Sequence, residues 1–176
     1  GGTMNTKIVF KLYKIFIENG FSAIRFNFRG VGKSDGIHDD GEGELSDAAS
    51  VLDWIQQYNT NSKICWVAGF SFGAWVAMQL LMRRPEINGF ISVSPPANIR
   101  DFSFLAPCPS SGLIIHGDKD NITSFDSSKI LAEKLQKQKK VDIKFKPIKG
   151  ADHFFENYSD EFSNIVDSYI KDSLKS

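Results

Sequence analysis

The sequence is poor in cysteine, in long apolar runs and in charge of one sign. Its two cysteines, Cys65 in an apolar strand-like segment and Cys108 between two prolines, are too few for a disulfide framework; we expect free thiols in a cytoplasmic protein. No apolar run approaches the roughly 18 residues that a membrane span needs, and the start lacks a signal-peptide pattern. Basic and acidic residues number 21 each, which disfavours nucleic acid and membrane surfaces as partners.

What the sequence does contain is an alternation of helix-like and strand-like segments. Helical spacing of apolar residues is found in residues 5–19, 44–58, 73–84, 124–138 and 155–174. Strand-like apolar runs occupy residues 21–28, 63–68, 87–93, 112–116 and 141–147. This alternation predicts an α/β fold with a mostly parallel sheet flanked by helices on both faces. We expect residues 1–176 to form one domain, in which the proline-containing stretch 94–111 is a loop too short for a lid domain.

The most informative pattern is GFSFG at residues 69–73, which follows an apolar strand and precedes a helical segment. In this context Gly-x-Ser-x-Gly is typical of a nucleophile elbow, a sharp strand-to-helix turn that exposes a serine hydroxyl. The glycines let strand and helix approach closely, and the helix N-terminus offers N–H groups to a developing oxyanion. The pattern predicts Ser71 as a nucleophile, although an ordinary glycine-rich turn remains an alternative on these five residues alone.

A serine nucleophile needs a base to accept its proton and an acid to orient that base. In an elbow-type sheet the acid follows a later strand, and the histidine follows the last strand. HGDKD at residues 116–120 comes after one expected strand, and ADH at residues 151–153 comes after the last. We therefore predict Asp120 as the acid and His153 as the base, at the carboxyl edge of a parallel sheet.

Four other aspartate and histidine residues have structural interpretations that need no catalytic role. Asp118 lies nearer the strand end than Asp120 and is suited to capping the turn, and Asp152 is interpreted as a turn residue. His116, at a strand end, is expected to be a hydrogen-bonded structural residue. His38 lies in a polar loop, where it either decorates the surface or lines the mouth of the site.

Together, RFNFRGVGKS at residues 25–34 and the GFSFG, HGDKD and ADH motifs resemble the α/β hydrolases. More narrowly, the sequence resembles the small lidless bacterial hydrolases that carry RFNFRGVG, from Gly1 to the last expected helix. The resemblance implies Ser71 as nucleophile, His153 as base and Asp120 as its partner. It also implies an ester, thioester or amide substrate, no metal or organic cofactor, and the backbone N–H of Phe72 as one oxyanion donor.

One departure from the family pattern concerns the start of the chain. The family's sheet normally has a strand and a His-Pro-rich loop just before GGTMN at residues 1–5, and that loop contributes the second oxyanion donor. By resemblance, the strand lies between those expected at residues 21–28 and 63–68. We therefore expect upstream residues in the natural protein. A chain beginning at Gly1 is expected to be poorly stable, and loss of one oxyanion donor costs on the order of a hundredfold to a thousandfold in rate.

The substrate is less constrained by the sequence than the chemistry. Phe70, Phe102, Phe104 and Phe154 are candidates for an apolar wall around the acyl group, and core packing explains each of them equally well. The motifs do not specify the natural substrate, the leaving group or the oligomeric state.

Two other functions fit parts of the sequence. Residues 27–34 nearly spell the P-loop of a nucleotide-binding protein, but Asn27 stands where a glycine is required and a polar loop follows Ser34 instead of a helix. A hydrolase-like module that binds ligands without catalysis is the second alternative. The complete set of serine, aspartate and histidine argues against it.

Overall fold

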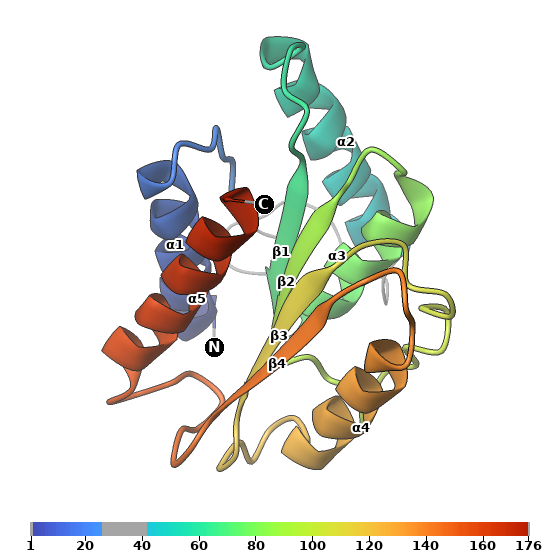
Figure 1. Ribbon diagram of the computed structural model, residues 1–176. Helices are drawn as coiled ribbons and strands as arrows, with labels where there is room; N and C mark the ends of the chain where they lie inside the picture. Colours follow the sequence, from blue (N-terminus) through green and yellow to red (C-terminus); the bar gives the residue numbers. More distant parts are fainter. Residues whose placement is uncertain (1, 26–41, 176) are drawn as a thin grey trace. The chain divides into compact units, whose positions relative to one another are not determined.

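The computed structural model describes residues 2–25 and 42–175 (Figure 1). The chain divides into two compact units, one of Gly1–Lys63 with Ser163–Ser176 and the other of Ile64–Phe162. The second unit contains all the described strands and the predicted catalytic residues Ser71, Asp120 and His153. A single domain over residues 1–176 stays a prediction.

The second unit is built on a sheet of four parallel strands in the order β1-β2-β3-β4 (Figure 1). The strands are β1 (Trp66–Phe70), β2 (Gly89–Val93), β3 (Gly112–Gly117) and β4 (Ile143–Ile148). Phe70 at the end of β1 pairs with Val93 at the end of β2, and Gly117 at the end of β3 pairs with Ile148 at the end of β4. Strands β3 and β4 run two residues further, since Val93 pairs with Ile115. The segments that follow the strands therefore gather at one edge of the sheet, where sites of open α/β sheets form. The predicted parallel sheet is confirmed.

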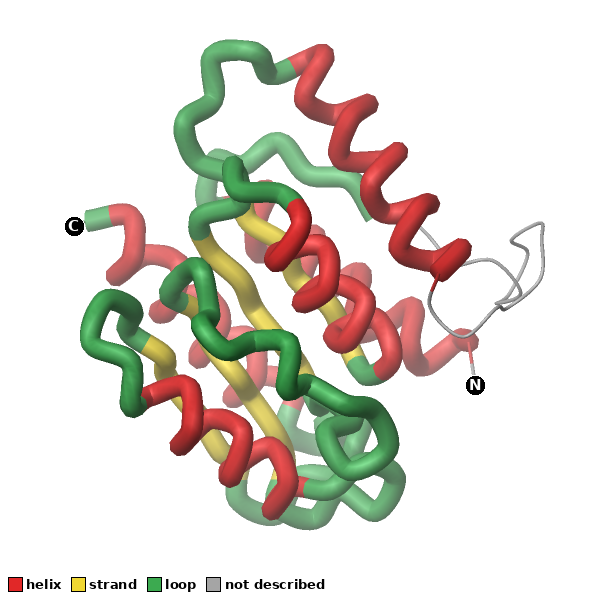
Figure 2. Tube along the Cα trace, turned by 90° about the vertical axis from the view of Figure 1, so that its right-hand side faces the viewer, coloured by secondary structure: helices red, strands yellow, loops and turns green. Residues whose placement is uncertain are grey.

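Two helices of the second unit pack on this sheet. Helix α3 (Phe72–Arg83) contacts β1 and β2, and α4 (Phe125–Gln136) contacts β3 and β4. Strands β2 and β3 are buried along their whole length, as expected for central strands of a parallel sheet. Helix α4 begins where the Ser124 hydroxyl accepts a hydrogen bond from the Ser127 backbone N–H at 3.0 Å, a typical N-cap. Figure 2 shows the loops that join these helices to the strands.

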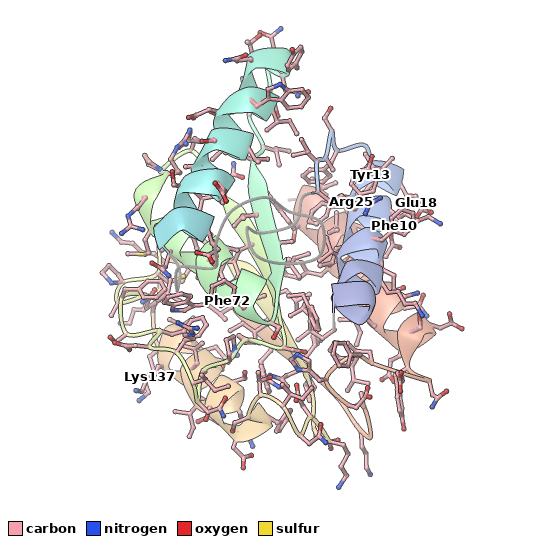
Figure 3. All side chains as sticks on the ribbon, turned by 180° about the vertical axis from the view of Figure 1, so that it is seen from behind. Phe10, Tyr13, Glu18, Arg25, Phe72 and Lys137 are labelled. Atoms are coloured by element: carbon pink, nitrogen blue, oxygen red, sulfur yellow. The ribbon has the colours of Figure 1, made fainter. Side chains whose placement is uncertain are left out.

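The first unit is helical in its described part. It contains α1 (Gly2–Glu18), α2 (Glu42–Tyr58) and most of α5 (Ser159–Leu174). Helices α1 and α5 lie side by side (Figure 1), and the Asn19 side-chain amide donates to an Asp167 carboxylate oxygen at 2.9 Å. The Arg25 guanidinium lies over the rings of Phe10 and Tyr13, 4.8 and 5.6 Å from their centroids (Figure 3). This cluster is remote in sequence from the predicted reactive residues.

The strand expected at residues 63–68 starts later than predicted. The ladder with β2 begins at Trp66, opposite Gly89, while the Cys65 backbone N–H donates instead to the Asn88 side-chain oxygen at 3.1 Å. Cys65 therefore precedes β1 and is half-buried, so its expected place inside a buried strand was wrong.

Two further segments differ from expectation. Residues 21–25 do not belong to the sheet, because an apolar run becomes a strand only when it pairs with a neighbour. The rest of the strand expected at 21–28, the P-loop-like residues 27–34 and His38 lie outside the described residues. Helix α5 begins at Ser159 instead of residue 155, because Phe155 and Asn157 have φ angles of 56° and 65°, which a right-handed helix excludes. Residues 94–111 are a loop, as predicted.

Candidate active site

Ser71 occupies the turn between β1 and α3. Its backbone has φ 57° and ψ −124°, a conformation that non-glycine residues rarely adopt. Two hydrogen bonds hold it there: the Ser71 N–H donates to the Val93 carbonyl at 2.8 Å, and the Ser71 carbonyl accepts from the Ala74 N–H at 2.9 Å. A Cβ atom at Gly69 would collide with the backbone of Gly73, so glycine is required for the close approach of strand and helix. The predicted elbow geometry is therefore present.

His153 lies against this serine, although 82 positions separate the two residues in the chain. The Ser71 hydroxyl is 3.1 Å from His153 Nε2, a distance at which it donates to an unprotonated ring nitrogen. On the other side of the ring, His153 Nδ1 donates to Asp120 Oδ2 at 2.6 Å. The structure thus brings together the three residues that sequence order singled out. His153 is 2% exposed, so the ring is shielded from solvent and held in one orientation.

Asp120 is a buried carboxylate with hydrogen-bond donors on both oxygens. Its Oδ1 accepts from the backbone N–H groups of Ile122 and Thr123, each at 2.8 Å. Its Oδ2 accepts from His153, from His116 Nε2 at 3.0 Å and from the Thr123 hydroxyl at 3.0 Å. Burial alone would raise the pKa of Asp120, but hydrogen bonds from His116, His153 and the two backbone N–H groups hold the pKa well below its usual range. Asp120 is therefore a fixed anion.

The other polar residues near the strand ends have the positions that their simpler interpretations predict. Asp118 accepts a hydrogen bond from the Gly150 N–H at 2.7 Å, which joins the turn after β3 to the turn after β4. Asp152 accepts from the Glu156 N–H at 2.9 Å and stabilises the turn that follows His153. Both are turn residues, as expected.

Sequence reasoning missed the contacts of His116 and Thr123 with Asp120. His116 is hydrogen-bonded, as predicted, but one of its partners is the carboxylate that orients His153. Its position four residues before Asp120, at the end of a buried strand, was the available signal. No pattern in the sequence distinguishes Thr123 from any other loop threonine.

The four candidate wall residues fall into two groups. Phe70 and Phe154 flank His153, with ring centroids 5.0 and 4.9 Å from the imidazole. Phe102 and Phe104 pack on each other, 6.1 Å apart, in the loop between β2 and β3. Among the ring contacts of the described residues, neither of this second pair reaches His153. Only Phe70 and Phe154 are therefore tied to the candidate site by a direct contact.

Phe72 is the first residue of α3 and directly follows the serine (Figure 3). Its ring packs on Trp75 at 5.6 Å, and the Arg100 guanidinium lies 5.1 and 4.8 Å from the two ring centroids. The start of a helix carries a partial positive charge, which favours an anion beside Ser71.

The described residues contain no group of three or more histidine, cysteine, aspartate or glutamate side chains that could hold a metal ion. None of the helices in the described ranges is both long and apolar enough to cross a membrane. The thiols of Cys65 and Cys108 are free, and Cys108 is buried.

Residues 1–112 match the α/β hydrolase fold family. The chain belongs to this family. A solved structure from Agrobacterium tumefaciens, a protein of unknown function assigned to the α/β hydrolases, is 53% identical to this hydrolase and superposes with a TM-score of 0.94, covering 98% of this chain and 79% of that one. The structure of a serine hydrolase without a lid from Xanthomonas campestris is 31% identical, with a TM-score of 0.82 over 96% of this chain and 74% of that one.

Two curated proteins are also similar to this chain. An uncharacterised protein of Rickettsia prowazekii is 51% identical over 173 residues, which are 96% of this chain and 73% of that protein. The chain spans about half the length of a more distant relative, the lysophosphatidylserine lipase of Xenopus tropicalis, at 26% identity over 91% of this chain and 52% of the lipase. The predicted family and fold class are confirmed, and the likeness to lidless members agrees with the short loop at residues 94–111.

Proposed function

We propose that this chain is a serine hydrolase that cleaves a carboxylic ester, thioester or amide of a small acyl substrate through an acyl-enzyme on Ser71. The observation that carries the proposal is the continuous hydrogen-bond chain from the Ser71 hydroxyl through His153 to Asp120, with distances of 3.1 and 2.6 Å. A serine, an imidazole and a carboxylate in this order form the constellation that activates a hydroxyl for attack on a carbonyl.

In the first step His153 Nε2 accepts the hydroxyl proton while Ser71 Oγ attacks the substrate carbonyl carbon. The imidazolium that forms is stabilised by Asp120, which accepts its Nδ1–H at 2.6 Å. Asp120 keeps its charge throughout, because its five hydrogen-bond donors favour the ionised form.

Negative charge then develops on the substrate carbonyl oxygen. We infer that the backbone N–H of Phe72 donates to this oxygen, because Phe72 follows the attacking serine and opens helix α3. Such a donor stabilises the transition state more than the ground state, since the oxygen is fully charged only in the tetrahedral intermediate.

The second half of the reaction uses the same histidine. The His153 imidazolium gives its proton to the departing alcohol, thiol or amine, and the acyl group stays on Ser71. Water then attacks the acyl-enzyme, His153 accepts its proton, and Ser71 leaves with a proton returned from the imidazolium. Every proton is accounted for with water as the sole co-reactant.

Several features support a small acyl substrate. The loop at residues 94–111 is too short to form a lid domain. The rings of Phe70 and Phe154 lie beside His153 and offer an apolar wall for the acyl group. The distant similarity to lysophosphatidylserine lipases favours an ester within the proposed range. The free cysteines and the relatives from bacteria support a bacterial cytoplasmic enzyme.

A fluorophosphonate probe, which reacts with activated serines, tests the proposal on the full chain. We expect labelling of the wild type, none in Ser71→Ala, and wild-type labelling in Ser168→Ala, which removes an exposed hydroxyl from α5. p-Nitrophenyl esters of graded length, thioesters and aminoacyl anilides then identify the substrate class. A folded wild type that is neither labelled nor active on any of these would instead point to a binding module without catalysis.

A further inference from the structure

Asp120 lies between two histidines, and the proposed mechanism uses only one of them. Its Oδ2 atom is 2.6 Å from His153 Nδ1 and 3.0 Å from His116 Nε2. The side chains of His116 and Asp120 are both fully buried. Because a buried polar ring must be paired to be tolerated, the partners of His116 indicate what it does.

The neighbours of His116 define its tautomer. Nε2 faces two acceptors, Asp120 Oδ2 and the Thr123 carbonyl oxygen at 3.2 Å, so Nε2 must carry a proton. Nδ1 is 2.7 Å from Ser128 Oγ, while the same hydroxyl is 3.3 Å from the Pro95 carbonyl. The Ser128 hydroxyl therefore anchors Nδ1, while the Nε2–H on the other side of the ring is directed at Asp120.

The other hydrogen-bond donors to Asp120 show what the Nε2–H of His116 contributes. Asp120 Oδ1 is held by two backbone N–H groups, which by themselves leave Oδ2 free to move about that anchor. The Thr123 hydroxyl has a single hydrogen, which it divides between Asp120 Oδ2 at 3.0 Å and the Ser94 carbonyl at 3.3 Å. His116 Nε2–H lies 3.0 Å from Asp120 Oδ2 and 3.2 Å from the Thr123 carbonyl, so Oδ2 is held by two ring N–H donors, those of His153 and His116, with the Thr123 hydroxyl as a third donor.

We propose that His116 is a positioning residue, whose Nε2–H fixes the Asp120 carboxylate so that Oδ2 meets the Nδ1–H of His153. This inference rests on the proposed function, in which His153 is the base. The hydroxyl of Ser128, in the first turn of α4, lies 2.7 Å from His116 Nδ1 and holds the ring in the orientation that directs Nε2–H at Asp120. Helix α4 thereby takes part in aligning the reactive residues.

Two substitutions at His116 distinguish the effect of losing its N–H donor from the effect of changing its side-chain volume. His116→Leu fills the space without a donor, whereas His116→Gln can place an amide N–H near the position of Nε2. With a p-nitrophenyl ester we expect His116→Leu to lower kcat about tenfold to a hundredfold with KM unchanged, since a misplacement of ~1 Å can cost about a hundredfold. His116→Gln is expected to restore kcat to within about threefold of the wild type.

A double-mutant cycle with Asp120→Ala tests whether His116 acts through Asp120. In the Asp120→Ala background, His116→Leu is expected to cost less than about twofold further, because the group that it positions is gone. An equal loss in both backgrounds, or a wild-type kcat in His116→Leu, would overturn the proposal. Should His116→Leu fail to fold, Ser128→Ala takes its place in the cycle, with the same dependence on Asp120 expected.

A spectroscopic measurement separates this inference from the proposed function. The proton between His153 Nδ1 and Asp120 is expected to give a far-downfield NMR resonance, whether or not the protein turns over an ester. We expect that resonance to persist in His116→Gln and to move upfield or vanish in His116→Leu or Ser128→Ala. An unchanged resonance in the donor-free variants would refute positioning by His116, whereas absence of fluorophosphonate labelling refutes only the hydrolase proposal.

Discussion

The Ser94 hydroxyl donates to the backbone carbonyl of His153 at 3.2 Å. Ser94 directly follows β2 and is completely buried, with a φ of 49° that places it in the left-handed region. Its own carbonyl accepts from the Thr123 hydroxyl at 3.3 Å. The end of β2 therefore contacts both later segments of the site, one that carries the base and one that surrounds Asp120.

Substitution of Ser94 should destabilise the protein through this contact. Ser94→Ala leaves the buried His153 carbonyl without its donor, and we expect the free energy of unfolding to fall by about 1–2 kcal/mol. Ser94→Gly loses the same bond but tolerates a positive φ, so it should unfold at a higher urea concentration than Ser94→Ala. Urea unfolding of the three proteins checks both statements. An alanine variant as stable as the wild type would contradict the first of them.

The two aspartates that follow β3 should differ sharply in their effect on activity. Asp120→Ala removes the group that orients His153, and we expect kcat to fall about a thousandfold or more. Asp118→Ala removes an exposed hydrogen bond from Gly150, which should cost about 0.5–1.5 kcal/mol of stability and leave kcat within a few-fold of the wild type. Steady-state hydrolysis of a p-nitrophenyl ester, with urea unfolding in parallel, measures both. Similar losses of kcat in the two variants would show that the wrong acid was chosen.

The depressed pKa of Asp120 predicts a pH dependence of stability. Because its pKa is lower in the folded than in the unfolded chain, ionised Asp120 stabilises the fold above pH ~3.9, and this contribution is lost as pH falls below that value. Asp120→Asn should therefore be less stable at neutral pH and show a shallower decline in unfolding free energy between about pH 4 and pH 2.

Asp167→Asn provides the comparison for that measurement. Hydrogen bonds from Lys171 and Asn19 also lower the pKa of Asp167, but this carboxylate lies at the surface, where solvent screens the interaction. Its substitution should change the acid limb of the unfolding curve less than Asp120→Asn does. A larger effect at Asp167 would contradict the assignment of acid sensitivity to Asp120.

The two pairs of phenylalanines should differ in their effect on substrate preference. Phe154 contacts His153, so Phe154→Ala should lower kcat/KM for a p-nitrophenyl butyrate more than for the acetate, by up to about tenfold for two methylenes. Phe104→Ala removes a ring of similar exposure that packs on Phe102, and should leave the ratio of the two substrates unchanged. Equal effects of the two variants on this ratio would exclude Phe154 as part of the acyl wall.

Much of the candidate site could be predicted because its signals are local or depend on chain order. Gly69 and Gly73 around Ser71 mark a turn in which a Cβ atom at Gly69 would collide with the backbone of Gly73, and the structure has that turn. Asp120 and His153 were found from their positions after later strands, because parallel strands bring their carboxyl ends to one edge.

The errors at the starts of β1 and α5 have different causes, one in strand pairing and one in local backbone conformation. Strand β1 starts at Trp66 because its hydrogen-bond ladder with β2 begins there. The sequence of the apolar run does not specify this register. Helix α5 starts later than predicted because Phe155 and Asn157 have positive φ angles. A phenylalanine rarely adopts such an angle, so the sequence does not predict it.

The alternation of strands and helices from residue 63 onward, the elbow around Ser71 and the three candidate reactive residues were predictable from the linear pattern, because backbone sterics and hydrophobic periodicity act over a few residues. The contact of His116 with Asp120 and the support of His153 by Ser94 arose only from packing, because their partners come from separate strands and loops. A residue type sets which hydrogen bonds a side chain can make. The fold decides which of those partners lies within hydrogen-bonding distance.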